Sequence, residues 1–203
     1  MQKIDYKKEL KHLYKPGNKP EIIKVPKMNY VTLEGKGDPN TSELFQQSVE
    51  ALYATCYNCK FYLKELGSEI DATVMPLEGQ WYMKGNKFDV NDRQNWLWKI
   101  MIMQPGHIKR AHIAEARKRA FKKKGNARIN DIIFEPIIEG TSVQVMHIGS
   151  FSEEGPVIAN MHNYAKEQGY KLRGRHHEIY LSDFRKVDPA KMKTVLRQPL
   201  EKA

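Results

Sequence analysis

Two stretches of this chain repeat one order of features, and this repeat constrains the fold more than anything else in the sequence. Each stretch reads as a strand, a glycine-bearing loop, a helix, a strand with a glutamate and an aromatic residue, a loop and a strand. Gly35 corresponds to Gly149, and Glu78 corresponds to Glu178. A single stretch has too few elements to cover both faces of a sheet. We therefore expect two units that share a core.

The expected fold is α+β, with tandem duplicated strand-helix-strand-strand units and antiparallel sheets around a pseudo-twofold axis. The two repeats are residues 27–104 and 129–203, and a basic helix within residues 105–128 joins them. Residues 1–26 are polar and contain three prolines, so they are expected to form an N-terminal extension. This lead is too short for a separate helix-turn-helix. Matching positions of the two repeats would line a central ligand cleft.

Length and composition set limits on the compartment. The chain has 203 residues, 40% of them hydrophobic, which is enough to bury a core without disulfides. No apolar run has the length needed to span a bilayer, and the N-terminus lacks the apolar segment of a signal peptide. We expect a cytoplasmic protein that does not associate with membranes. Whether the protein is a monomer or a dimer stays open.

The positive charge is concentrated in one segment. Of the formal net charge of +10, most comes from nine Lys and Arg residues between His107 and Arg128, which only Glu115 offsets. A basic helix is commonly a solvated surface, and this one lacks the interleaved aromatic residues on which bases stack. The pattern therefore disfavours nucleic acid as a partner and leaves the role of the helix open.

The two cysteines have the spacing C-x-x-C. Redox pairs of this spacing usually lie where a helix begins, whereas Cys56 and Cys59 fall well inside a helical pattern. A structural zinc would require two further ligands, and the sequence has no second pair of this kind. We expect two cysteines packed on a helix, with no metal and no cofactor.

The segment from His176 to Ser182 is the first candidate for a functional strand. Ile179 alternates with Glu178 and Tyr180, so the glutamate and the tyrosine should share one face of the strand, with His176 at its edge. A carboxylate beside an aromatic ring on a rigid strand suits the floor of a pocket. On its own, the pattern is more typical of a surface strand that carries a glutamate, and only the matching residues of the other repeat favour a pocket.

The first repeat offers matching residues. Glu78 precedes Trp81, and a later strand carries Trp96 and Trp98 on one face. Two tryptophans on one face most often belong to a core, and they also suit the wall of an apolar pocket. The sequence leaves two positions open for Trp96, which either faces the pocket together with Trp98 or is packed behind the sheet.

These motifs together resemble the GyrI-like small-molecule-binding family over about residues 30–200. The motifs that carry the resemblance are Tyr30-Val31-Thr32-Leu33-Glu34-Gly35-Lys36-Gly37, Pro76-Leu77-Glu78-Gly79-Gln80-Trp81, Trp96-Leu97-Trp98 with Met101-Ile102-Met103-Gln104-Pro105, Val145-Met146-His147-Ile148-Gly149 and His177-Glu178-Ile179-Tyr180-Leu181-Ser182-Asp183. Relatives include ligand-sensing domains of transcription regulators, free-standing binding proteins and a gyrase-inhibiting protein. The tryptophan motifs are most similar to those of its cyclopropanoid cyclopropyl hydrolases.

The resemblance implies an aromatic, Glu-containing cleft that binds flat hydrophobic xenobiotics. It also implies hydrolysis of the cyclopropane of DNA-alkylating compounds, which would protect the cell. Glu178 or Glu78 would orient water, and their proximity should leave one carboxyl protonated near neutral pH. The expected ligand contacts are Trp81, Trp98, Tyr180, Tyr57, His147 and Trp96. His147 is a candidate donor to the ligand oxygen, although a histidine on a strand is more often a satisfied core histidine.

Two other functions stay open at this point. The same pocket suits a protein that only binds, sequesters or senses its ligand. A gyrase-type protein-interaction module is the other alternative, and the basic helix would then be the contact surface.

Overall fold

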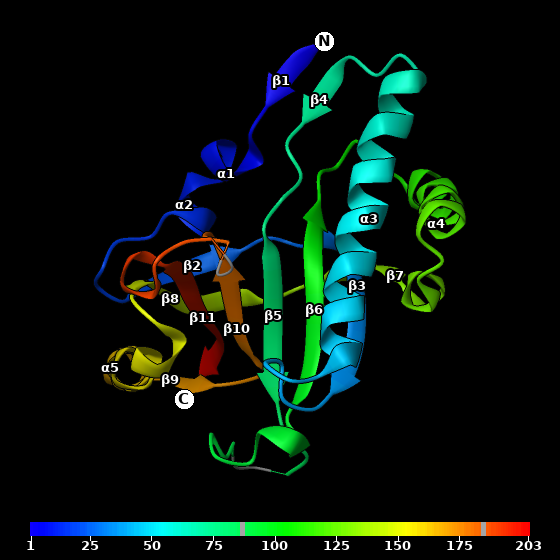
Figure 1. Cartoon of the computed structure of the whole chain (residues 1–203). Helices are drawn as coiled ribbons and strands as arrows, with labels where there is room; N and C mark the ends of the chain where they lie inside the picture. Colours follow the sequence, from blue (N-terminus) through cyan, green and yellow to red (C-terminus); the bar gives the residue numbers. More distant parts are fainter. Residues whose placement is uncertain (86–87, 184–185) are drawn as a thin grey trace. The chain divides into compact units, whose positions relative to one another are not determined.

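The computed structural model describes residues 1–85, 88–183 and 186–203. Within these residues the expected α+β class is confirmed, since helices are combined with mainly antiparallel sheets (Figure 1). The chain forms two compact units. Unit 1 contains Met1–Tyr6, Met28–Leu77 and Trp81–Ile137, and unit 2 contains Lys7–Lys27, Glu78–Gln80 and Ile138–Ala203.

Unit 1 is a sheet with two long helices. Its strands follow the order β5-β6-β3-β7, β3 is antiparallel to both of its neighbours, and β1 and β4 form a separate parallel pair. Helix α3 contacts β3 and β6, and α4 packs against α3 (Figure 1). The elements are β1 (Gln2–Ile4), β3 (Met28–Lys36), α3 (Glu43–Glu65), β4 (Ile70–Ala72), β5 (Leu77–Tyr82, of which Glu78–Gln80 belong to unit 2), η1 (Arg93–Asn95), β6 (Leu97–Gln104), α4 (Arg110–Lys124), η2 (Ala127–Asp131) and β7 (Ile133–Ile137).

Unit 2 is a second antiparallel sheet with one long helix. Its strands follow the order β2-β8-β11-β10, and β9 pairs with the end of β11. Helix α5 packs through Met161 and Ala165 on Val143, Val145 and Leu196. The elements are α1 (Tyr6–Glu9), α2 (Lys11–Tyr14), β2 (Glu21–Val25), β8 (Gly140–Ile148), η3 (Phe151–Glu153), α5 (Glu154–Glu167), β9 (Tyr170–Leu172), β10 (His176–Tyr180), η4 (Pro189–Lys191) and β11 (Lys193–Lys202).

The order of elements is the same in both units. In unit 1, β3 is followed by α3 and then by β4, β5 and β6, and in unit 2, β8 is followed by α5 and then by β9, β10 and β11. The duplication and its pseudo-twofold axis stay predictions. Within the described residues, no helix combines the length and the apolar character needed to cross a membrane.

Two segments that border the predicted repeats have a defined place in the structure, namely the N-terminal segment and the residues around the basic helix. The expected extension is part of unit 2 from Lys7 onward, because Leu13 and Tyr14 are buried and the Leu13 carbonyl accepts a hydrogen bond from Arg197 at 2.6 Å. The second repeat, expected from residue 129, begins with a 3-10 helix, and its first strand starts at Ile133. The basic helix lies within the expected residues 105–128 and ends at a left-handed Gly125.

Helix α3 shows why its sequence folds locally as expected. The Ser42 hydroxyl caps the first turn by accepting a hydrogen bond from the Phe45 N–H at 3.2 Å. Cys56 and Cys59 are buried on the apolar side of this helix as separate thiols. Burial raises their pKa values to about 12 and about 11, so both stay protonated and unreactive at neutral pH. The C-x-x-C pair is packing, as the sequence predicted.

A close approach between β3 and β6 fixes the position of one tryptophan. Gly35 lies directly opposite Trp98 in the register of the two strands, so both occupy the same face. The Trp98 indole is fully buried, lies over Gly35 and meets the Phe45 ring edge-on at 5.1 Å. Glycine is required here because a Cβ would overlap the indole.

A buried network of charged side chains joins the N-terminal segment, β5, β10 and β11 within unit 2. His177 places Nδ1 2.8 Å from Glu139 and Nε2 3.0 Å from Glu78, the second contact being poorly aligned for a hydrogen bond. The Tyr14 hydroxyl donates to Glu78 at 2.8 Å, and Arg197 lies 3.4 Å from Glu139. Two carboxylates therefore face two cations in a region from which water is excluded.

Electrostatics within this network keep the charged forms in place. Burial opposes ionisation of His177, but Glu139 and then Glu78 outweigh it and raise the pKa of the imidazole to about 9. Burial likewise opposes ionisation of Glu139, and the His177 and Arg197 cations nevertheless lower the pKa of this carboxyl to about 2. Burial followed by the Glu78 charge raises the pKa of Tyr14, which stays neutral. The network holds β10 from the face on which His177 lies.

We predict that Gly35→Ala lowers the free energy of unfolding by about 1–3 kcal/mol, because the added methyl displaces Trp98 from a packed core. Urea denaturation measures the change. Gly106→Ala is the matched control, since a Cβ there meets open space. Equal stability of the two variants would show that the indole adjusts without strain.

We predict that Glu139→Gln lowers the free energy of unfolding by about 3–5 kcal/mol at pH 7, because it leaves His177 and Arg197 without their shared carboxylate. Urea denaturation against an exposed control, Glu167→Gln, measures the difference.

The same variant should alter the pH dependence of stability. The contribution of Glu139 is present above its unfolded pKa and disappears as pH falls through about 2. The contribution of His177 is complete below its unfolded pKa of 6.5 and disappears as pH rises through about 9. Between pH 6 and pH 9.5 the natural chain should therefore lose more stability than Glu139→Gln does. Parallel pH profiles would contradict the network.

Candidate functional site

Strand β10 presents a carboxylate and an aromatic hydroxyl on the face that α5 covers. Glu178 lies opposite Leu196 on β11, which belongs to the core beneath α5. The Tyr180 hydroxyl donates to Glu178 Oε2 at 2.8 Å, and His176 Nε2 lies 3.5 Å from Glu178 Oε1. The expected sharing of one face is confirmed. The Glu178 side chain keeps 14% of its surface exposed, so it is reachable from solvent.

A second carboxylate lies close to Glu178. Glu154 is the first residue of α5, and its carboxyl is buried with Thr194 as hydrogen-bond partner. Burial followed by repulsion from Glu178 raises the pKa of Glu154 to about 9. The N-terminus of α5 favours the ionised form of Glu154. Burial and the Glu178 charge oppose ionisation more strongly, so the pKa stays raised. At neutral pH Glu154 is therefore a neutral acid beside the Glu178 carboxylate.

Several polar atoms around this pair lack protein partners. Among the described residues, Glu154 Oε1, His162 Nε2 and both ring nitrogens of His176 are buried without a hydrogen bond. Burial, followed by the nearby His176, lowers the pKa of His162 to about 4, so its ring is neutral at physiological pH. Unsatisfied buried polar atoms are costly in a folded protein and are typical of sites that receive water or a ligand. No group of three metal-binding side chains occurs within the described part of the chain.

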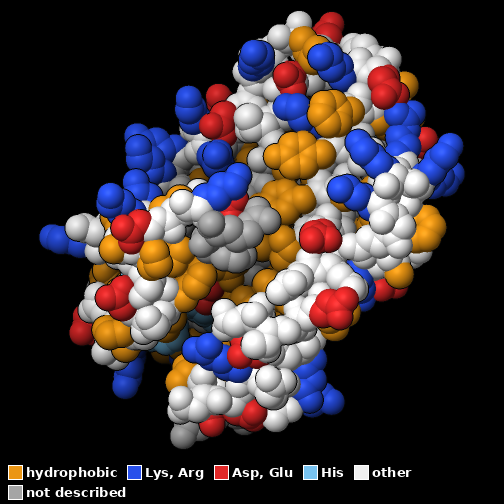
Figure 2. All heavy atoms as spheres, in the orientation of Figure 1, with side chains coloured by type: hydrophobic (Ala, Val, Ile, Leu, Met, Phe, Trp, Pro, Cys, Tyr) orange, Lys and Arg blue, Asp and Glu red, His pale blue; other side chains and the backbone are white. Residues whose placement is uncertain are grey.

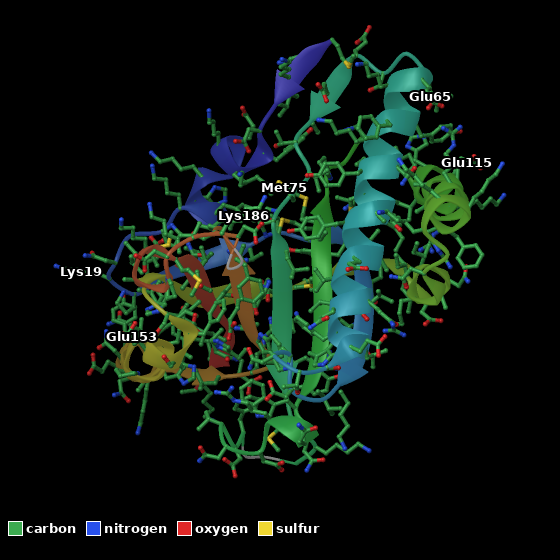
Figure 3. All side chains as sticks on the ribbon, viewed as in Figure 1. Lys19, Glu65, Met75, Glu115, Glu153 and Lys186 are labelled. Atoms are coloured by element: carbon green, nitrogen blue, oxygen red, sulfur yellow. The ribbon has the colours of Figure 1, made fainter. Side chains whose placement is uncertain are left out.

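Aromatic surface borders the carboxylates from one side. The Phe151 ring meets the Tyr180 ring edge-on at 5.7 Å, just before α5 begins. Figure 3 marks the neighbouring Glu153 at this end of α5, where its carboxylate accepts hydrogen bonds from Ser150 and closes the turn. The turn thereby places Phe151 and Glu154 next to β10.

His147 is held by the backbone. It is buried on β8, and its Nε2 lies 3.0 Å from the Ser150 carbonyl oxygen. A carbonyl only accepts hydrogen bonds, so Nε2 carries the proton and is already used. Of the two interpretations of His147, the structure supports the satisfied histidine.

Glu78 and Glu178 do not face one another. Glu78 contacts His177, and Glu178 is the next residue along β10, so the two glutamates lie on opposite faces of the unit 2 sheet. Glu78 is also fully buried in the ion network with Tyr14. The expected pairing of these two carboxylates is wrong because the repeat positions match in sequence but not in the face they present. The partner of Glu178 is Glu154.

The expected aromatic contacts of unit 1 form a cluster of their own. Trp81 lies edge-on to Trp96 at 5.7 Å and stacks on Phe45 at 6.0 Å. Trp96 is partly exposed and donates its indole N–H to the Asp89 carbonyl at 2.8 Å. Trp98 is enclosed in the core, so it offers no surface to a ligand. Tyr57 is 48% exposed on α3 and stacks on Tyr53.

Comparison with known proteins places these features in a family. The family profile described as GyrI-like small molecule binding domain matches residues 18–201. No curated protein matches the chain.

Three crystal structures from Listeria innocua cover nearly the whole chain. One is of an uncharacterized conserved protein, with 42% sequence identity and a TM-score of 0.92. Two are of hydrolases, with identities of 41% and 39% and TM-scores of 0.90 and 0.86. Each alignment covers 98% of this chain and 100% of the relative. The C-terminal domain of EcmrR, at 16% identity and a TM-score of 0.56, shares the fold over 91% of this chain and 98% of its own.

The family profile covers residues 18–201, and the three Listeria innocua structures are 39–42% identical to this chain over 98% of its length. The chain belongs to the GyrI-like small-molecule-binding family.

Proposed function

We propose that this protein binds flat, hydrophobic aromatic molecules and hydrolyses the cyclopropane ring of cyclopropanoid DNA-alkylating compounds, which protects the cell. The observation that carries the proposal is the buried Glu154 carboxyl near Glu178, because burial and then the Glu178 charge raise the pKa of Glu154 to about 9 and keep it a neutral acid at physiological pH. Two relatives at about 40% identity are hydrolases, which supports a catalytic role for the pair.

The proposed reaction is the addition of water to a strained ring. The Glu178 carboxylate accepts a proton from a water molecule. At the same time the oxygen of that water forms a bond to the cyclopropane methylene. The ring bond to that carbon breaks, and its electron pair moves through the dienone to the carbonyl oxygen. Glu154 donates its proton to this oxygen, so a neutral phenol results. A proton then returns from Glu178 to Glu154 through water.

Neighbouring side chains fix the geometry of the base. The Tyr180 hydroxyl donates to one oxygen of Glu178, which limits rotation of the carboxylate, and His176 lies 3.5 Å from the other oxygen without a hydrogen bond. The Tyr180 and Phe151 rings supply apolar surface on which a flat molecule can stack. Trp81 and Trp96 remain predicted ligand contacts within unit 1. Tyr57 and Trp98 have weaker support, since one is on an exposed helix surface and the other is enclosed.

One observation favours binding without turnover as the second candidate function. The Tyr180 hydroxyl already occupies one oxygen of Glu178, an arrangement that also suits a fixed negative charge facing a bound molecule. A protein of this kind would sequester or sense its ligand. The number of turnovers separates the two functions.

We predict that catalytic amounts of the protein convert a cyclopropane-bearing alkylator to its ring-opened alcohol through many turnovers. Glu178→Gln should lower kcat about 100-fold or more, because the amide cannot accept the proton from water. Chromatography of the products measures the rate, and Glu167→Gln on the exposed end of α5 is the matched control. Protection that stops at one alkylator per protein would identify a sequestering protein instead.

We predict that kcat falls as pH rises through about 9, because Glu154 loses the proton that it donates. Glu154→Gln should be slow at every pH and should lack this alkaline decline. Rates measured between pH 6 and pH 10 test the assignment. An alkaline decline that persists in Glu154→Gln would assign the acid to another group.

A further inference from the structure

Unit 1 contains an open groove that the proposed function does not use. The groove has a volume of about 210 Å³ and is lined by α4, the end of η2 and β7. Its apolar residues are Ile113, Ala114, Ile132, Ile133 and Phe134, and Arg110 and Arg117 flank them.

The flanking arginines follow one stripe of α4. Arg110, Ala114, Arg117 and Phe121 recur every three or four residues, so they share one face of the helix. Phe121 is 41% exposed and continues the apolar surface beyond the groove. Large side chains exposed beside an apolar groove are typical of surfaces that bind proteins.

Contacts within unit 1 hold the groove open in a defined shape. The Arg117 guanidinium donates to the backbone carbonyls of Ile129 and Asn130, which fixes η2 beside α4. The Arg110 guanidinium lies over the Phe134 ring at 5.6 Å. The next residue on β7, Glu135, points to the opposite face, where it binds Lys99 at 2.9 Å. The carboxylate of β7 therefore does not neutralise the groove.

Positive charge surrounds the groove. Figure 2 shows Lys and Arg side chains gathered over the region of α4. Arg119 is neutralised by Glu65 and Glu115, which Figure 3 marks on the facing sides of α3 and α4. Among the described residues, Lys118, Lys122 and Lys124 have no acidic partner, so the last turns of α4 keep an uncompensated charge.

We infer that this groove is a docking site for an acidic protein segment that carries large apolar side chains. Its acidic residues would pair with the exposed cations of α4, and its apolar side chains would fill the groove between Arg110 and Arg117. A nucleic acid would use only the cations, because phosphates gain nothing from an apolar floor or from the exposed Phe121. The apolar floor therefore favours the peptide.

The test uses the full chain and a short fluorescein-labelled peptide of Glu and Asp that contains a Leu and a Phe one helical turn apart. A second peptide replaces both apolar residues by Ala, and a single-stranded oligonucleotide of equal charge serves as the polyanion control. We expect the first peptide to bind about tenfold or more tightly than the second, measured by fluorescence anisotropy. Equal affinities for all three probes, or no binding of the first peptide, would overturn the inference.

Two substitutions separate filling of the groove from charge. Ala114→Lys adds a cation but fills the groove, whereas Ala111→Lys adds the same cation at an exposed position away from the stripe. Ala114→Lys should weaken peptide binding about tenfold, and Ala111→Lys should leave it unchanged or strengthen it. Circular dichroism confirms that both variants fold. An Ala114→Lys chain that binds the peptide as well as Ala111→Lys would show that charge alone attracts it.

Discussion

The buried ion network of Glu78, His177, Glu139 and Arg197 is the interaction on which the rest of unit 2 depends. It joins the N-terminal segment, through Tyr14 and the Leu13 carbonyl, to the central strands. Charges with this degree of burial are stable only as a complete set, since removal of one partner leaves the others unpaired. The network therefore gives β10 a fixed position from one side.

That fixed position matters because β10 carries the candidate functional residues on its other side. His177 belongs to the network and Glu178 to the candidate site, so a single strand separates the two. The face with the network excludes solvent and keeps Glu139 ionised by direct pairing with cations. On the other face Glu154 has no cation beside it, and burial keeps it neutral. The same residue type thus takes two protonation states within one unit.

The three tryptophans of unit 1 differ in burial. Trp98 is needed to fill the core over Gly35, and Trp81 is also buried, whereas Trp96 is partly exposed. The tryptophan motifs therefore combine two residues that stabilise the fold with one that keeps exposed surface. The family relationship supports binding of small molecules by such a chain, and the carboxyl pair of unit 2 supports chemistry on them.

The sequence by itself determined the features that depend on local periodicity. It predicted the α+β class, a helix with packed cysteines, a basic helix within residues 105–128, and a strand with Glu178 and Tyr180 on one face. Only the tertiary structure decided which carboxyl meets Glu178, because Glu154 reaches it from a different element, and its position at a helix start indicated only a dipole interaction. Tertiary structure also decided the burial of Glu78, since its partners Tyr14 and His177 are distant in sequence and no local pattern links them.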